Sequence, residues 1–393
     1  MSIRLRVNLA VYWNQTVPEL PEVETVKRGL NKLIIGRKIA AVKSDNPKSF
    51  PNAPADVNNF LIDASVTEVR RRAKVLMIDL STDYTLVIHL KMTGQLVFVN
   101  RVTDDTRTSI LTERLRAGSD KGPDALSNSG CRGSDKTEVQ LSSSQRATDV
   151  FSIHGTLEPK SDPTPGLESN LARSSALNED TSRGELEEID IRFAGGHPND
   201  SLINSLPDKS TRVTFEFDDG SHLYFNDQRK FGWVRLMPTL EVPNIDFMKR
   251  VGPEPLEADF TAEQFAQRFE RRARTTIKAA ILDQSVIAGV GNIYADESLW
   301  GAKIHPATKV GDLPYSKFKL LYSELRTVMN LSIEKGGSTN RNYVNAEGKK
   351  GSYMEFACVF RREGLPCPRC GTEIIKIRVA GRGTHICPKE QTL

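Results

Sequence analysis

Apolar residues recur at helical spacing near the start of the chain and alternate with polar ones further along. The segment after Pro18 has one apolar face, formed by Val23, Val26, Leu30 and Leu33. This spacing predicts an amphipathic helix with a side to bury. Between residues 66 and 99 the pattern becomes strand-like, with alternating apolar positions at Leu76, Ile78 and Leu80.

Further along, a pair of strands and several helices are predicted. Residues 211–217 and 223–225 flank Asp219-Gly220, a turn-forming pair that favours a hairpin. Thr261 and Gln264 have the spacing of a capping box, which predicts a helix start. More helices are expected at about 276–283, 292–300 and 316–335. The tail from residue 353 is strand-like and carries cysteines.

Residues 102–191 differ from both flanks. They are rich in Ser, Thr, Asp, Gly and Arg, contain few aromatic residues and show no sustained periodicity. A segment of this composition cannot bury enough apolar area to offset its ordering entropy, so we predict that it is disordered. We assign no role to Cys131 or His154, which lie within it.

Charge is distributed unevenly along the chain. Residues 101–190 hold 17 acids and 11 bases, so a net charge of +4 leaves about +10 on the rest. A basic folded part favours a polyanionic partner. The sequence has no apolar run near the roughly 20 residues that a membrane-spanning helix needs, so we expect a soluble protein. Three of the five cysteines cluster near the C-terminus, which favours a metal site in a reducing cytoplasm over a disulfide scaffold.

The segment Pro18-Glu19-Leu20-Pro21-Glu22-Val23-Glu24 resembles the start of the formamidopyrimidine-DNA glycosylases, which normally begin Met-Pro-Glu-Leu-Pro-Glu. In that family the initiator is removed and the proline becomes the catalytic N-terminus. A proline nitrogen is nucleophilic only as a free secondary amine, yet here sixteen residues precede Val17. A GUG start codon would be translated as valine, so we expect that Val17 is the true start and that residues 1–16 are a mis-annotated extension. The alternative is a genuine extension that is removed by processing or that leaves the protein inactive.

The resemblance implies three catalytic residues. Pro18 would attack the sugar of the damaged nucleotide, Glu19 would donate a proton for opening of the sugar ring, and Lys74 would lie beside the phosphate and sugar. Glu22 would share this pocket as a substrate-binding residue. Taken alone, Lys74 is typical of a solvated lysine, and carboxylates near a helix N-terminus are stabilised electrostatically without any catalytic role.

The resemblance also implies residues that hold the DNA. Excision needs the damaged nucleotide turned out of the duplex, and bulky side chains on loop tips then fill the gap. Met92, Arg229 and Phe231 match the family's void-filling residues. The other residues expected to contact substrate or DNA are His89, Lys278, Asn292 in the turn after Gly289, Arg341 in the loop that closes over the extruded base, and Arg382 in the finger.

Cys367-Pro368-Arg369-Cys370 and Cys387-Pro388-Lys389-Glu390 resemble the two turns of the family's zinc finger. The family has four cysteines, and this chain has Glu390 at the fourth position. We expect one structural Zn2+ at Cys367, Cys370 and Cys387, with Glu390 or the nearby His385 as the fourth ligand. The alternative is a weakened or metal-free hairpin.

The resemblance implies an α+β fold with three domains. An N-terminal two-sheet β-sandwich flanked by helices (17–245) would precede a helix–two-turns–helix domain (250–345) and a C-terminal zinc-finger β-hairpin (353–393). Because the resemblance continues on both sides of residues 102–191, we interpret them as an insertion into a surface loop.

The function that the resemblance implies is that of a bifunctional DNA glycosylase and AP lyase that excises oxidised purines. Its partner would be double-stranded DNA containing oxidised or abasic sites, and we expect a monomer in the bacterial cytoplasm, at the nucleoid, without membrane contact. One alternative is a catalytically silent damaged-DNA-binding protein, if Pro18 is not the mature N-terminus. A zinc-ribbon RNA-binding protein is a more remote alternative, which would leave the opening segment unexplained.

Overall fold

The computed structural model describes residues 18–101, 190–196, 205–338 and 353–393. In the first part of the chain, antiparallel strands form two sheets, with the strand orders β1-β7-β8-β5-β6 and β2-β3-β4-β9. The strands are β1 Ile39–Ser44, β2 Val66–Arg72, β3 Val75–Leu80, β4 Tyr84–His89, β5 Gly94–Arg101, β6 Asp190–Gly196, β7 Thr211–Phe217, β8 His222–Asp227 and β9 Trp233–Pro238.

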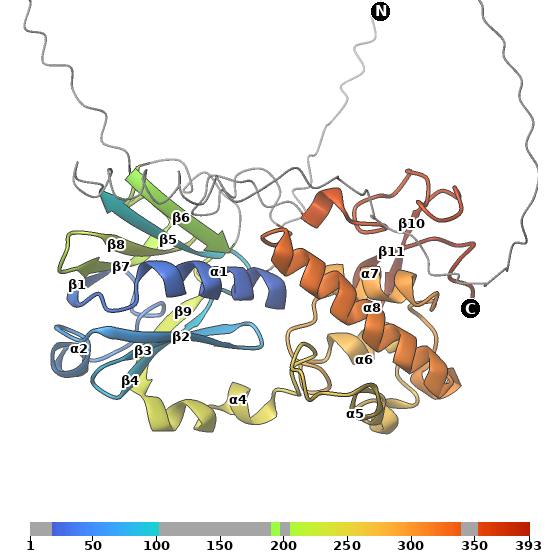
Figure 1. Cartoon of the computed structure of the whole chain (residues 1–393), viewed down its shortest axis with the longest axis horizontal. Coiled ribbons are helices and arrows are strands. Elements are labelled where there is room, and N and C mark those ends of the chain that lie inside the picture. The colour runs from blue at the N-terminus through green and yellow to red at the C-terminus, as the bar shows by residue number, and fades with distance from the viewer. Residues whose placement is uncertain (1–17, 102–189, 197–204, 339–352) are drawn as a thin grey trace, which may run out of the picture. The chain divides into compact units, whose positions relative to one another are not determined.

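A single apolar core joins the two sheets and the helix α1 (Leu20–Leu33). The residues predicted to form the buried face of this helix pack into that core, although Leu33 is only partly buried. Figure 1 shows α1 running beside both sheets. The approach to β6 is close, because a Cβ atom at Gly29 would lie 2.0 Å from the Phe193 ring. A short helix α2 (Pro54–Phe60) also belongs to this part, and its Phe60 ring stacks on Tyr84.

The strands β5 and β6 pair from Gln95 opposite Gly196 to Arg101 opposite Asp190. Their ends flank residues 102–189, so most of the segment predicted to be a disordered insertion lies outside the described residues. Its last two positions, 190 and 191, belong to β6 instead. The inserted segment therefore starts and ends at neighbouring positions of one antiparallel pair.

Helices dominate the next part of the chain. They are α4 Asp246–Arg250, α5 Ala262–Gln267, α6 Ile277–Leu282, α7 Asn292–Gly301 and α8 Tyr315–Glu334, with short 3-10 turns η2 Thr239–Asn244, η3 Glu270–Arg272 and η4 Val310–Asp312. The predicted capping box of Thr261 and Gln264 opens α5, and α8 ends before Gly336, which has a φ of 78°. A second apolar core unites α5, α6, α7 and α8 and includes Leu20 from α1, whereas Phe247 and Met248 of α4 pack against a separate apolar cluster on β3 and β4.

The chain closes with the turn η5 (Tyr353–Glu355) and an antiparallel hairpin of β10 (Ile375–Val379) and β11 (Arg382–Ile386). The hairpin packs through a small cluster of Trp300, Val359, Ile374 and the buried Cys358, Cys367 and Cys387, with Cys370 partly buried against it. The predicted α+β class, with a two-sheet sandwich, a helical region and a C-terminal hairpin, is confirmed.

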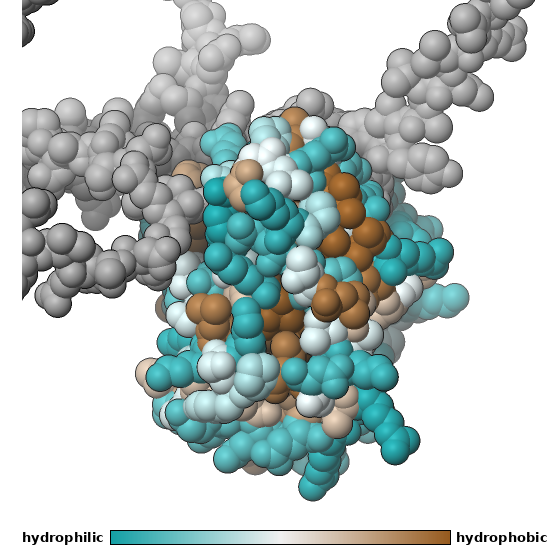
Figure 2. Space-filling model, turned by 90° about the vertical axis from the view of Figure 1, so that its right-hand side faces the viewer, coloured by the Kyte–Doolittle hydropathy of each residue, from teal (hydrophilic) through white to brown (hydrophobic). Residues whose placement is uncertain are grey.

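The surface over the right-hand side of Figure 1 is largely hydrophilic, with apolar side chains gathered in limited patches, as Figure 2 shows. The helices within the described ranges are all too short or too polar to cross a membrane.

Candidate active site

The N-terminal end of α1 carries Pro18, Glu19 and Glu22, all buried. Glu19 is the N-cap residue with extended backbone, and Pro21 stands in the first turn, where a missing N–H costs nothing. The Oε2 atom of Glu22 accepts a hydrogen bond of 2.8 Å from the Glu19 amide. The carboxylate of Glu22 therefore caps the helix that begins immediately after Pro18.

Glu22 also connects this helix to the helical region. Its Oε1 atom accepts hydrogen bonds from the Tyr294 hydroxyl at 2.6 Å and from the Ser338 amide at 2.8 Å. The Tyr294 hydroxyl lies 2.6 Å from the Ser332 hydroxyl in α8. Both carboxylate oxygens of Glu22 are thus engaged, which fixes α1 against α7 and the end of α8.

The two carboxylate oxygens of Glu19 differ in their hydrogen bonding. Its Oε1 atom accepts a hydrogen bond of 3.1 Å from the Ile293 amide, whereas its buried Oε2 atom has no hydrogen-bond partner among the described residues. The carboxylate lies over Gly291, where an added Cβ atom would be 2.0 Å from the Glu19 Cδ atom. Burial raises the pKa of Glu19 to about 7, a net value to which the charge of Lys74, which lowers it, and that of Glu22, which raises it, both contribute. A carboxyl group of this pKa can hold and deliver a proton near neutral pH.

Lys74 lies between β2 and β3 of the sheet, and its side chain extends to the turn that contains Val290 and Gly291. It follows Ala73, whose φ of 52° turns the chain between β2 and β3. Its Nζ atom donates a hydrogen bond of 3.0 Å to the Val290 carbonyl, which also accepts one of 2.8 Å from Gln284. Burial lowers the pKa of Lys74, while Glu19 and Glu22 act in the opposite direction.

Glu254 fixes the turn that carries Lys74, and the sequence interpretation missed it. Its carboxylate accepts hydrogen bonds from the Ala73 amide and from Arg71 Nη1, the latter at 2.8 Å. Arg71 also donates to Glu24 of α1 at 2.9 Å. Glu254 is buried and lies 181 positions from Ala73 in the chain, so no local pattern points to this contact.

Met92, Arg229 and Phe231 stand on two neighbouring turns. Lys91 and Lys230, the residues before Met92 and Phe231, have φ values of 53° and 58°, so both turns are tight. Met92 is half-buried, whereas Phe231 is 52% exposed and has the Arg229 guanidinium 5.0 Å from its ring centre.

Asp227 joins these two turns, and it too was missed. Its Oδ1 atom accepts a hydrogen bond from the Thr93 hydroxyl and one of 3.2 Å from the Arg229 amide. Its Oδ2 atom accepts one of 2.6 Å from the Gly232 amide. This fully buried carboxylate at the end of β8 therefore positions all three predicted void-filling residues.

His89 is the last residue of β4 and stands directly before the turn that carries Met92. Its Nδ1 atom accepts a hydrogen bond of 3.0 Å from the Lys91 amide. Burial, together with the charges of Lys91 and Lys74, lowers the pKa of His89 to about 3, so the imidazole is neutral at physiological pH. His89 can therefore offer DNA hydrogen bonds or packing but not a positive charge.

Asn292 and Arg382 lie where the helical region meets the C-terminal hairpin. Asn292 donates a hydrogen bond of 3.1 Å from Nδ2 to the Gly383 carbonyl, and its buried Oδ1 atom has no partner within the described ranges. Arg382 is exposed, and its charge lowers the pKa of both Lys74 and Lys278, so the three cations share one electrostatic region.

Lys278 differs from the other cations because it is fully buried. Its Nζ atom pairs with Asp296 and donates a hydrogen bond of 2.7 Å to the Thr384 hydroxyl. These bonds tie α6 to β11, and a direct contact of Lys278 with DNA stays a prediction. Arg341 lies outside the described residues, so its predicted contact with the extruded base is likewise not tested.

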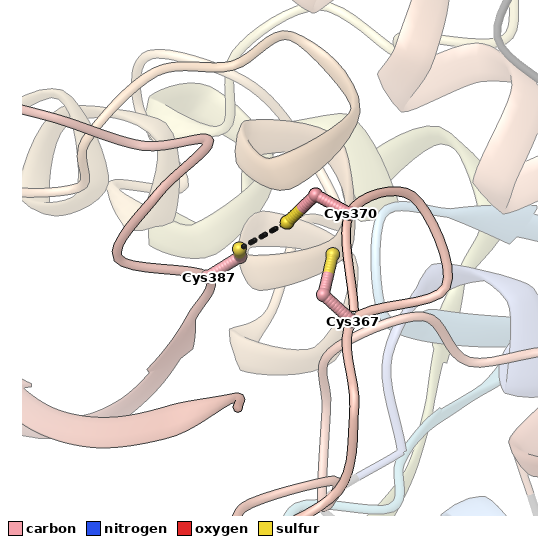
Figure 3. A group of neighbouring side chains, drawn as sticks. All are labelled: Cys367, Cys370 and Cys387. Atoms are coloured by element: carbon pink, nitrogen blue, oxygen red, sulfur yellow. Dashed lines mark hydrogen bonds between the residues drawn. The ribbon is translucent and has the colours of Figure 1, made fainter. Parts of the chain in front are cut away.

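Three cysteines converge at the base of the hairpin. The sulfur atoms of Cys367, Cys370 and Cys387 lie within 4.8 Å of one another and point toward a common centre in Figure 3. Hydrogen bonds from Thr372 lower the pKa of the Cys370 thiol to about 7, whereas burial raises the pKa of Cys387 to about 11 against the hydrogen bonds from the Lys389 and Glu390 amides. Sulfur atoms in a tetrahedral zinc site lie about 3.8 Å apart with bonds of about 2.3 Å, so these residues fit zinc.

Three parts of the chain match models of known protein families. Residues 17–129 match the formamidopyrimidine-DNA glycosylase N-terminal domain, residues 251–344 match the H2TH domain of the same glycosylase, and residues 364–389 match the zinc finger found in FPG and IleRS. Together with the three cysteines, the last match identifies the hairpin as a zinc site.

Two proteins that are similar in sequence over nearly their whole length are both formamidopyrimidine-DNA glycosylases. Formamidopyrimidine-DNA glycosylase of Herpetosiphon aurantiacus is 33% identical, with 95% of this chain and 98% of the relative covered, and that of Ligilactobacillus salivarius is 30% identical, with 96% and 99% covered.

Similar solved structures include DNA complexes. A complex of a Lactococcus lactis FPG mutant with Fapy-dG DNA superposes with a TM-score of 0.65 at 26% identity, covering 96% of this chain and 100% of that one. The Lactococcus lactis Fpg complex with abasic-site DNA gives 0.64 at 26% identity, with 95% and 100% covered.

Proposed function

Because the chain belongs to the formamidopyrimidine-DNA glycosylase family and is therefore a DNA glycosylase, we propose that it excises oxidised purines from double-stranded DNA and then cuts the strand. The substrates would be 8-oxoguanine and formamidopyrimidines. Similar proteins have been solved with Fapy-dG DNA, with carbocyclic 8-oxo-G DNA and with abasic-site DNA, which supports this choice. Such a substrate would place the protein in the cytoplasm, at the nucleoid.

The observation that carries the proposal is the state of Glu19. It lies directly after Pro18, has an unpartnered buried oxygen, and has a pKa of about 7. A buried carboxyl with a free oxygen is suited to give a proton to an atom that enters the pocket.

The mechanism starts from a Pro18 nitrogen that is a free secondary amine. Its lone pair attacks C1′ of the extruded nucleotide, and Glu19 protonates O4′ as the sugar ring opens. The Pro18 nitrogen then gives its N–H proton to the departing base, which leaves with the electron pair of the glycosidic bond, and the nitrogen–C1′ bond becomes an iminium ion. The iminium acidifies the C2′ proton, whose loss expels the 3′ phosphate, and a second elimination expels the 5′ phosphate.

The DNA would be held by positive and polar side chains around this pocket. Lys74, Asn292 and Arg382 would contact phosphates, with Lys278 supporting them from the buried side. Met92, Arg229 and Phe231 would fill the gap left by the extruded nucleotide, and Glu22, His89 and Arg341 would contact the substrate. We propose a catalytic domain at 17–245, a DNA-binding domain at 250–345 and a finger at 353–393, a division supported by the family matches to residues 17–129, 251–344 and 364–389.

The proposal is tested by two forms of the protein. One is the full 393-residue chain and the other begins at Pro18. With borohydride and 8-oxoguanine duplex, the form that begins at Pro18 should give a covalent protein–DNA adduct, because only a free amine forms a reducible iminium. An adduct of equal yield from the full chain, with residues 1–16 verified as intact, would falsify the assignment of Pro18. If neither form gives an adduct but both bind damaged duplex, the second candidate function, binding without catalysis, is supported.

A further inference from the structure

Among the residues that the structure describes, the zinc site lacks an evident fourth protein ligand. Glu390 stands at the position of the family's fourth cysteine, and His385 is close by in the sequence. The group of possible metal ligands found within the described residues contains Cys367, Cys370 and Cys387 without either of them.

The carboxylate of Glu390 forms ion pairs with two cationic side chains instead. Its Oε2 atom lies 3.2 Å from Arg369 Nη1 and 3.3 Å from Lys303 Nζ. The Arg369 guanidinium also lies 3.9 Å from the Trp300 ring centre and donates a hydrogen bond of 3.2 Å to the Trp300 carbonyl. Glu390 therefore holds Arg369 in place, and Arg369 connects the turn of Cys367–Cys370 to the end of α7.

The imidazole of His385 also contacts other side chains, through both of its ring nitrogens. Its Nδ1 atom lies 3.3 Å from Asp296 Oδ2, and its Nε2 atom lies 2.8 Å from Glu363 Oε2. Its backbone amide donates to the same Asp296 oxygen at 3.0 Å. Since both ring nitrogens have carboxylate partners and the residue lies within β11, coordination would require dismantling this strand contact.

The second cysteine turn is held without help from Glu390. The Cys387 amide donates a hydrogen bond of 3.0 Å to Gln391 Oε1, and Gln391 Nε2 donates one of 2.9 Å to the Ile304 carbonyl. The turn can therefore keep its shape while the Glu390 side chain points to the cations.

Charge explains why a carboxylate is tolerated here. A site with four thiolates and one Zn2+ carries two negative charges, which Arg369 and Lys303 would balance. With three thiolates the site carries one negative charge, and Glu390 supplies the second one directly to the two cations. The substitution thus keeps the local charge but removes a ligand.

From these contacts we propose that zinc is held by three thiolates, with its fourth position open to a solvent molecule or another small exogenous ligand. Glu390 is a positioning residue that anchors the finger through Arg369 and Lys303. A zinc ion with an open position differs from closed structural sites, which have four protein ligands. The inference rests on the zinc site alone and not on the role of Pro18.

The test replaces zinc by Co2+ in the full chain, because the intensity of sulfur-to-cobalt absorption follows the number of thiolates. Glu390→Gln should leave both this band and the visible cobalt spectrum unchanged. Glu390→Cys should raise the band about 1.3-fold, since three thiolates become four. A changed spectrum in Glu390→Gln would make Glu390 a ligand, and an unchanged one in Glu390→Cys would mean that another protein group fills the fourth position; either result overturns the proposal.

A second measurement has its main readout in the wild type, so a failure of a variant to fold does not affect it. Titration of the cobalt-loaded wild type with a small monothiol should raise the same band about 1.3-fold, because an open position accepts one more sulfur. Glu390→Cys should not respond. Failure of the wild type to respond, or to bind one metal ion per chain at all, contradicts the inference, and neither result depends on base excision.

Discussion

The residue whose environment matters most for chemistry is Glu19. If it delivers the proton that opens the sugar ring, Glu19→Gln should lower the rate of 8-oxoguanine excision by about 100-fold or more, as for loss of a general acid. The rate of the wild type should fall as the pH rises above about 7, because the carboxyl then loses its proton. The measurement is single-turnover excision by the form that begins at Pro18, between pH 5.5 and 9.

Borohydride trapping on an abasic site is the matched control. An abasic sugar already exposes its aldehyde, so imine formation there does not need ring opening by Glu19. A variant that loses trapping and excision together would show damage to the whole pocket rather than loss of one proton donor.

Glu19 also makes stability depend on pH. The ordinary pKa of a glutamate is 4.5, whereas the pKa of Glu19 in the folded chain is about 7, so the folded state keeps a proton that the unfolded state releases. Stability from this group is complete below about pH 4.5 and is lost as the pH rises through 7, by on the order of 3 kcal/mol. Glu19→Gln should therefore gain stability over the wild type at pH 8 and not at pH 4.5, as measured by urea unfolding.

Asp227 is the residue on which the two DNA-facing turns depend. Asp227→Asn replaces an acceptor of three hydrogen bonds by a group with one acceptor oxygen, so it should cost about 1–3 kcal/mol of stability. Because Arg229 and Phe231 lose their common support, the kcat/KM for excision from duplex should fall more than that for excision from single strands. Asp219→Asn changes a similar turn elsewhere, where Asp219 accepts from Ser221, and it should leave this ratio unchanged. Equal losses on both substrates would speak against a positioning role for Asp227.

At the scale of elements, the pair of β5 and β6 makes a specific prediction about the inserted segment. Since Arg101 and Asp190 are opposite each other, residues 102–189 can be replaced by Asn-Gly, the pair that favours a two-residue hairpin turn. We expect cooperative unfolding and excision to be retained, with a stability gain of up to roughly 3 kcal/mol from closing a shorter loop. Thermal unfolding and excision assays check this. Loss of the cooperative transition would show that the fold needs the segment.

Local patterns were enough to predict most elements. The spacing of Val23, Val26 and Leu30 predicts α1, and Asp219-Gly220 predicts the turn between β7 and β8, because each pattern lies within one element or one turn. The short helix α2 carries no such signal, since none of its residues is fully buried.

The supports of the candidate site could not be predicted in the same way. Glu254 lies 181 positions from Ala73, and Lys278 lies 106 positions from Thr384. Contacts of this kind depend on how distant elements pack, and a single sequence holds no periodicity that reports them. The burial of Lys278 is the clearest example, because an isolated lysine in a sequence is normally expected at the surface.

At the scale of the whole molecule, the positive charge lies outside residues 101–190. Residues 101–190 have a net charge of about −6 and the rest about +10. Affinity for lesion duplex should therefore fall as salt rises, with a slope set by the phosphates contacted. Arg382→Gln should reduce that slope by about 0.9, whereas Lys43→Gln, on β1 beside Glu216, should not change it. Fluorescence anisotropy at several salt concentrations gives both slopes, and equal slopes for wild type and Arg382→Gln would exclude a phosphate contact.

The pairing of β5 with β6 also means that chain continuity is dispensable at one place. A break between Arg101 and Asp190 would leave two polypeptides, each contributing strands to the same sheet: the first brings β1 and β5, the second β6, β7 and β8. Pro18, Glu19 and Lys74 would reside on the first piece, and the Gly289–Asn292 turn and the cysteine hairpin on the second. The protein could accordingly be produced as two co-expressed halves whose reassociation reconstitutes the pocket, so that repair activity itself reports when the halves meet.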